Sequence, residues 1–197
     1  MRFQDALNPV LGSPSKLRLL RTMFVAPVRS WTGRELAQAA RVSTAQAARD
    51  LSELANTSLV RRDVVGRAYS WRLSSTHILA PVLAELFQQE AGLRSDLLRT
   101  VSEALHIESI ERARIFGSVS RGEERDDSDV DLFVQIRSAR DRAVVEMAVE
   151  TVRSRVWDRF GNPVSALVYT RSEAEHARNP VLLDTIDVEG LDVAGKD

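Results

Sequence analysis

The segment that most constrains the fold is residues 115–134, IFGSVSRGEERDDSDVDLFV. It predicts a strand that ends at Phe116, a tight turn into a short helix, and a second strand over residues 130–135. Side chains alternate along a strand, so Asp129 and Asp131 are expected on one face and the apolar residues on the other. The alternative is an ordinary glycine-rich turn before an acidic edge strand, which leaves two acids in an apolar strand unexplained.

Two carboxylates one pleat apart indicate a particular chemistry. Mg²⁺ is commonly bound by one or two protein carboxylates together with substrate phosphates. Gly117 allows the backbone to approach a ligand closely, and Ser118 is expected at a helix N-terminus, where anions are stabilised. The segment therefore predicts that Asp129 and Asp131 bind Mg²⁺ together with a nucleoside triphosphate.

The pattern of Gly-Ser, ten intervening residues and Asp-x-Asp is similar to the signature of minimal nucleotidyltransferases, in the DNA polymerase beta superfamily. The resemblance covers roughly the C-terminal half of the chain. It implies a nucleotidyltransferase domain over residues 109–197 that transfers a nucleoside monophosphate, with AMP expected, from an Mg²⁺-bound triphosphate to a hydroxyl acceptor. The implied site comprises two catalytic, metal-binding acids, Asp129 and Asp131, and four nucleotide-binding residues, Gly117, Ser118, Arg121 and Ser128.

One feature departs from the family pattern. Active members usually carry a third carboxylate on a later strand, but residues 163–170 contain no acid, and Ser165 stands near the expected position. Glu173 and Glu175 lie beyond this strand, and Asp126 and Asp127 are expected to be loop acids. Two interpretations stay open: an enzyme that modifies a partner protein, as an antitoxin modifies a toxin, or a regulator that binds Mg²⁺ and nucleotide only as a sensor.

Charge is distributed unevenly along the chain. Residues 1–75 hold twelve Lys and Arg against five Asp and Glu, a net charge of +7, whereas the rest of the chain is at −8. Such asymmetry favours a nucleic-acid partner for the basic half, although drift in surface charge is the alternative. There is no cysteine, and no apolar stretch approaches a membrane span, so a cytoplasmic protein is expected.

The N-terminal part has the pattern of a helix-turn-helix. Thr32 to Glu35 and Ser43 to Gln46 are two predicted capping boxes, which begin two short helices joined by a tight turn. Two strands around Gly66 then predict a hairpin. This order resembles the winged helix-turn-helix of bacterial transcription regulators and implies that residues 1–75 bind duplex DNA.

In such domains the second helix of the motif enters the major groove and the hairpin lies near phosphates. The implied DNA-binding residues are Thr44, Gln46, Arg49, Arg61, Arg62 and Arg67. Two alternatives remain open: Gln46 can be occupied by its own capping box, and the strand arginines can simply be solvated. Trp31 and Trp71 are expected to pack in the core.

The remaining segments complete an α+β prediction: a winged helix-turn-helix, a helical connector over residues 76–108, and a polymerase-beta-like domain with a mixed sheet. In the connector Pro81 predicts a helix start or kink and Gly92 a bend, and a homodimer is possible through its apolar residues. The last domain is expected to hold a helix over 141–160, a strand over 164–169, two short helices and a tail over 191–196. The apolar face predicted for the long helix consists of Val144, Val145, Ala148, Val152 and Val156.

Overall fold

The computed structural model describes residues 7–125, 128–177 and 179–195. The chain divides into two compact units, Met1–Ala91 and Gly92–Asp197. Asp126 and Asp127, expected to be loop acids, lie outside the described residues. Within the described part of the chain, no helix is both long and apolar enough to cross a membrane.

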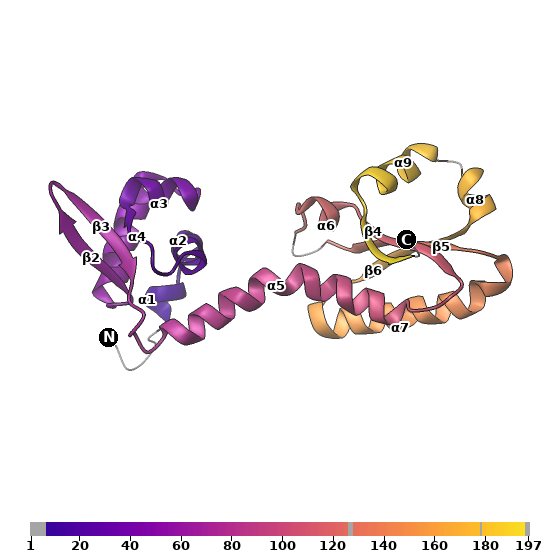
Figure 1. Ribbon diagram of the computed structural model, residues 1–197, viewed down its shortest axis with the longest axis horizontal. Coiled ribbons are helices and arrows are strands. Elements are labelled where there is room, and N and C mark those ends of the chain that lie inside the picture. The colour runs from indigo at the N-terminus through magenta and orange to yellow at the C-terminus, as the bar shows by residue number, and fades with distance from the viewer. Residues whose placement is uncertain (1–6, 126–127, 178, 196–197) are drawn as a thin grey trace. The chain divides into compact units, whose positions relative to one another are not determined.

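The first unit consists of a group of short helices beside a small antiparallel sheet (Figure 1). Its elements are α1 (Asn8–Leu11), α2 (Pro14–Val25), β1 (Trp31–Thr32), α3 (Gly33–Ala39), α4 (Thr44–Asn56), β2 (Val60–Val65) and β3 (Ala68–Leu73). The sheet order is β1-β3-β2, and β2 and β3 form the expected hairpin, with Val65 paired to Ala68. The helix α1 lies where the sequence predicted no element.

The two helix starts differ in their capping. At α3, Thr32 and Glu35 form the reciprocal capping box that the sequence predicted. At α4, the Ser43 hydroxyl accepts a hydrogen bond from the Gln46 backbone N–H, but the Gln46 side chain does not return to Ser43. The second capping box is therefore only half formed, and the predicted return bond from the Gln46 side chain is wrong. Charged side chains one turn away hold the Gln46 amide instead.

The core of the first unit gathers apolar side chains from all three longer helices and the sheet. Trp31 and Trp71 are cross-strand partners and both are buried, which confirms the expectation that they pack in the core. Leu83 and Phe87, from the first part of the long helix that follows, belong to the same core.

The connector is dominated by one helix, α5 (Ala80–Ala104). Pro81 lies in its first turn, where the missing N–H costs nothing. The helix runs through Gly92 without interruption, so this glycine does not end it. One glycine costs a helix only about 1 kcal/mol relative to alanine, and the residues on either side of Gly92 are held by packing in the two cores.

The second unit is built on a mixed four-stranded sheet in the order β6-β5-β4-β7. Its elements are β4 (Ile110–Phe116), α6 (Ser118–Arg121), β5 (Val130–Ile136), the 3₁₀ turn η1 (Ala139–Asp141), α7 (Arg142–Phe160), β6 (Val164–Thr170), α8 (Arg171–Glu175), α9 (Pro180–Glu189) and β7 (Leu191–Gly195). Among the described strands of this unit, only β5 and β6 pair in parallel. One core lies between the sheet and α7, and a smaller one forms under α9, so the α+β class is confirmed.

Two local predictions in this unit are wrong. Residues 191–195 form a strand paired with β4 instead of a tail, because the free edge of β4 supplies a partner that is remote in sequence. In α7, Val144 is 49% exposed and Val149 is buried, because the core-facing stripe follows the 4-3-4 spacing that starts at Val145.

Candidate functional site

The turn between β4 and α6 is shaped by Gly117. This residue has φ of 75°, in the left-handed region that favours glycine. A Cβ atom built on Gly117 would lie 2.3 Å from Oδ2 of Asp131, so no side chain fits there unless that carboxylate moves. The glycine therefore brings the backbone of the turn against the carboxylate, and Ser118 follows it at the start of α6.

The two aspartates differ in their surroundings. Asp129 precedes β5 and is exposed, whereas Asp131 is half-buried and lies across from Phe116 of β4. Burial raises the pKa of Asp131 above its ordinary value, and the charge of Asp129 raises it further, against an opposing effect of Arg121. Two carboxylates that disfavour each other's charge are suited to accept a cation between them.

Ser165 lies beside both aspartates. Its position on β6 is in register with Asp131, and its hydroxyl donates a hydrogen bond of 3.0 Å to Oδ2 of Asp129. Glu173, the next acid along the chain, is held in the capping box of α8 and by an ion pair with Arg142. Within the described residues, no group of three or more His, Cys, Asp or Glu side chains could hold a metal ion.

The other expected nucleotide-binding residues have protein partners. Arg121 donates from Nε to Glu123 over 2.9 Å and from Nη1 to Glu189 over 3.1 Å. The Ser128 hydroxyl accepts from the backbone N–H of Arg125, and its carbonyl accepts from Asn162. Ser128 therefore stabilises the loop before Asp129, while Arg121 is tied to the end of α9.

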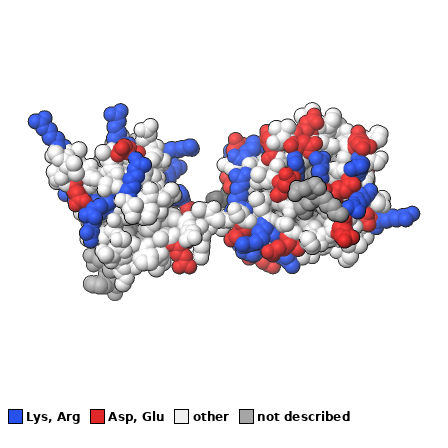
Figure 2. Space-filling model, in the orientation of Figure 1, with Lys and Arg blue, Asp and Glu red and all other residues white. Residues whose placement is uncertain are grey.

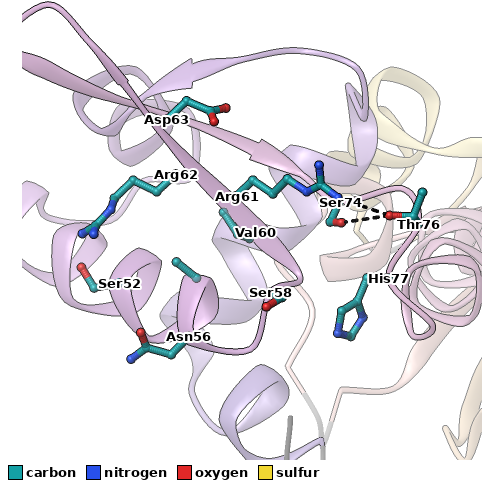
Figure 3. A pocket seen from close by; sticks show the side chains of 11 residues that line it. Ser52, Asn56, Ser58, Val60, Arg61, Arg62, Asp63, Ser74, Thr76 and His77 are labelled. Carbon is teal, nitrogen blue, oxygen red and sulfur yellow. Dashed lines mark hydrogen bonds between the residues drawn. The ribbon is translucent and has the colours of Figure 1, made fainter.

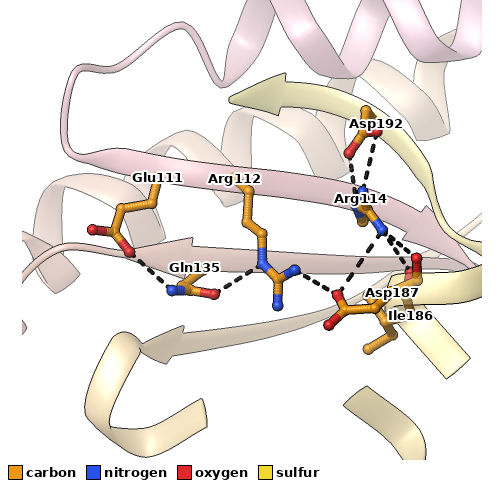
Figure 4. Close-up of polar contacts among 7 residues, drawn as sticks. All are labelled: Glu111, Arg112, Arg114, Gln135, Ile186, Asp187 and Asp192. Carbon is orange, nitrogen blue, oxygen red and sulfur yellow. Dashed lines mark hydrogen bonds and ion pairs between the residues drawn. The ribbon is translucent and has the colours of Figure 1, made fainter. Parts of the chain in front are cut away.

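No local pattern in the sequence predicted that α9 approaches this site. A chain of polar contacts fixes α9 and β7 to β4 (Figure 4): Arg112 donates to Gln135 and Asp187, and Arg114 donates to Asp192 and to the Ile186 and Asp187 carbonyls. These contacts place the last turn of α9, with Glu189, next to Arg121. The contacts of Arg112 and Arg114 with α9 and β7 join residues 72 or more positions apart, which no local pattern could reveal.

In the first unit, the expected DNA-binding residues lie on α4 and the hairpin. Thr44 and Arg49 are exposed on α4, and Gln46 is half-buried between them. On the face drawn in Figure 2, blue Lys and Arg atoms outnumber red acidic ones over this unit, whereas the second unit mixes both signs. The basic character predicted from the sequence is thus found on an exposed surface.

The hairpin arginines flank a polar pocket. Arg61 and Arg62 of β2 line a hollow of about 680 Å³ together with residues of α4 and of the turn before α5 (Figure 3). The Arg61 guanidinium donates to the Thr76 hydroxyl over 3.4 Å, and that of Arg62 lies 4.7 Å from the centre of the Tyr69 ring. Arg67 is exposed in the turn of the hairpin.

Comparison with known proteins identifies part of the chain. Residues 100–176 match the family model described as polymerase beta, nucleotidyltransferase. This range contains the Gly117 turn, both aspartates and Ser165, so it is a polymerase-beta-type nucleotidyltransferase domain. The chain matches no curated protein in sequence.

Three solved structures resemble parts of the chain. A toxin-antitoxin with AMP-PNP is 19% identical, with a TM-score of 0.38, over 51% of this chain and 74% of that one. A mutant of the toxin-antitoxin MntA-HpeT is 15% identical, with a TM-score of 0.36, over 53% and 74%. TrmBL2, an archaeal chromatin protein, is 12% identical, with a TM-score of 0.25, over 84% and 70%.

Proposed function

We propose that the nucleotidyltransferase domain, which we take to extend over residues 109–197, binds a nucleoside triphosphate with Mg²⁺ at Asp129 and Asp131. The observation that carries this proposal is the pair of adjacent carboxylates, one of them with a raised pKa, packed against the Gly117 turn. The oxygen donors present, two carboxylates and the Ser165 hydroxyl, fit a hard cation whose remaining ligands are phosphate oxygens and water.

The nucleotide would contact the turn and the residues around it. Gly117 and Ser118 offer backbone N–H groups to phosphate oxygens, and Ser128 holds the loop that leads to Asp129. Arg121 supplies positive charge to the triphosphate and must exchange its contact with Glu189 to do so. Bound Mg²⁺ would neutralise phosphate charge and acidify an attacking hydroxyl.

The reaction that this site supports best is transfer of a nucleoside monophosphate, with AMP expected, to a hydroxyl group of a partner protein. A bond forms between the acceptor oxygen and the α-phosphorus, the bond to the β-phosphate oxygen breaks, and pyrophosphate leaves with its electron pair. The acceptor proton needs a base. Ser165 cannot serve, and loss of a general base typically costs 10²–10⁴-fold in rate, so transfer by this chain alone is expected to be slow.

A labelling experiment tests this activity. The protein would be incubated with Mg²⁺, α-labelled ATP and the products of neighbouring genes, in the manner of an antitoxin and its toxin. Label on a partner protein that is lost with Asp129→Asn supports transfer. The second candidate is a regulator that binds Mg²⁺ and ATP only as a sensor, which the contact between Ser165 and Asp129 favours. Saturable ATP binding without label on any partner would support that candidate.

The N-terminal unit is proposed to bind duplex DNA, with its winged helix-turn-helix over residues 1–75 and α5 in the connector over 76–108. The observation that supports this is a set of exposed side chains on α4 and the hairpin: Thr44, Arg49, Arg61, Arg62 and Arg67. Gln46 lies within the same surface. Fluorescence anisotropy at several salt concentrations tests the proposal, since affinity must fall as salt rises if the arginines contact phosphates. Absence of any salt-dependent binding would exclude this role.

A further inference from the structure

Three side chains within one turn of α4 form a hydrogen-bonded relay. The amide nitrogen of Gln46 donates to Oδ1 of Asp50 over 2.9 Å, and the amide oxygen of Gln46 accepts from Nη2 of Arg49 over 2.6 Å. Asp50 is only 3% exposed, Gln46 is half-buried and Arg49 is exposed. The relay therefore runs from the core of the first unit to its surface.

Chemistry fixes the direction of the amide in this relay. A carboxylate only accepts hydrogen bonds, and a guanidinium only donates them. The NH₂ group of Gln46 must therefore face Asp50, and its oxygen must face Arg49. One N–H of Gln46 and one lone pair of its oxygen are thereby engaged within the relay, which leaves this amide only one further N–H and one further lone pair.

Burial of the Asp50 carboxylate lowers the stability of the first unit, and the fold does not require an acid at this position. Oδ2 of Asp50 has no hydrogen-bond partner among the described residues, and the described residues form no ion pair with this carboxylate. A buried carboxylate with an unsatisfied oxygen is destabilising, and an apolar side chain would fill the position better. A role in orienting Gln46 gives the acid a function at this position.

We propose that Asp50 and Gln46 are positioning residues that hold Arg49 as a guanine reader, an inference that rests on the proposed DNA binding. Held at Nη2 by Gln46, the guanidinium keeps its remaining N–H groups, all donors, on the exposed face of α4. In the major groove guanine presents two acceptors, O6 and N7, on one edge, whereas adenine presents one acceptor and one donor. A surface that offers only donors therefore selects guanine.

The test uses the full chain and duplexes that it selects from random-sequence DNA. Each guanine of the selected site is replaced in turn by 7-deazaguanine, which lacks the N7 acceptor. At one guanine the replacement should weaken binding about ten-fold or more, and Arg49→Ala should abolish that difference. A selected site in which no guanine shows this N7 dependence overturns the proposal, and a wild-type protein that binds no DNA overturns the proposed DNA binding with it.

The positioning role is tested by variants that break or retain the relay. Gln46→Leu and Asp50→Leu should reduce discrimination against 7-deazaguanine while the dependence of affinity on salt stays the same, because phosphate contacts are unaffected. Asp50→Asn keeps an acceptor oxygen for Gln46 and should retain discrimination. Thermal melting identifies any variant that fails to fold, and Gln46→Leu, at a half-buried helix position, keeps the test valid if Asp50→Leu does not fold. Full discrimination in folded Gln46→Leu would overturn the role of the relay.

Discussion

At the scale of single residues, the candidate site contains two carboxylates whose charges disfavour each other. Asp131 is half-buried beside Asp129, and the turn at Gly117 packs directly against its carboxylate. Such an arrangement costs stability in the free protein and is useful only if a cation compensates for the negative charge. The stability of the domain is therefore expected to rise when its proposed ligand binds.

Asp131→Asn should make the free protein more stable near neutral pH. A carboxyl group with a higher pKa in the folded than in the unfolded protein stabilises the fold when the pH is below the pKa of the unfolded state. This stabilisation is lost as the pH rises through the pKa of the folded state. Removing the charge should therefore raise the melting temperature by about 1–3 °C at neutral pH and have no such effect in acid. The same variant should lose Mg²⁺-dependent ATP binding in calorimetry. A variant that binds as well as wild type would contradict the assigned role of Asp131.

Ser165→Asp should restore a third carboxylate. The hydroxyl of Ser165 is already 3.0 Å from Asp129, so an aspartate at this position would face the same cation. We expect the melting temperature to fall without Mg²⁺, because a third negative charge is added, and to rise more steeply with Mg²⁺ than in wild type. Nucleotide transfer should increase by ten-fold or more, on the scale of a general base. Ser165→Asn is the matched neutral control, and equal Mg²⁺ responses of the two variants would argue against this geometry.

At the scale of elements, α9 links the C-terminal end of the domain to Arg121, at the end of α6. Its last turn carries Glu189, which pairs with Arg121, and its position is fixed by the contacts of Arg112 and Arg114. An incoming triphosphate must compete with Glu189 for the same guanidinium. The affinity for nucleotide should therefore depend on a residue outside the sequence signature.

Glu189→Gln tests this competition. Removing the charge should free Arg121 for the phosphates and increase ATP affinity by about two- to five-fold, since an exposed ion pair contributes up to about 1 kcal/mol. Glu123→Gln, on the other side of Arg121, is a matched comparison, and Arg121→Ala should weaken binding in every background. Calorimetry provides the measurement, and a lower affinity in Glu189→Gln would mean that Glu189 orients Arg121 instead of competing for it.

At the scale of the whole molecule, the homodimer expected from the sequence is open to test. Val82 and Leu86, one turn apart on α5, are 64% and 47% exposed. Winged helix-turn-helix proteins that read two half-sites do so as dimers. Leu86→Lys should shift the protein toward monomer in analytical ultracentrifugation without changing its melting temperature by more than about 2 °C. Val64→Lys, at an exposed apolar position on the hairpin, is the control, and a wild-type monomer at high concentration would contradict the expectation.

The sequence by itself determined the elements whose signals are local. The Gly-Ser turn, the alternation around Asp129 and Asp131, the capping of α3 and the hairpin at Gly66 all follow from residues within a few positions of one another. Such features depend on backbone preference and periodicity, which a single segment contains in full. For this reason most helices, most strands and the α+β class were predicted from the sequence.

The tertiary structure alone decided the contacts between distant segments. Strand pairing of residues 191–195 with β4, the approach of Glu189 to Arg121 and the hydrogen bond between Ser165 and Asp129 join residues 36 or more positions apart. The direction of the Gln46 amide was also undecided by the sequence, because the capping box and the relay with Asp50 compete for one group. Which partner wins depends on burial and on the charge of the neighbours, and these exist only once the chain has folded.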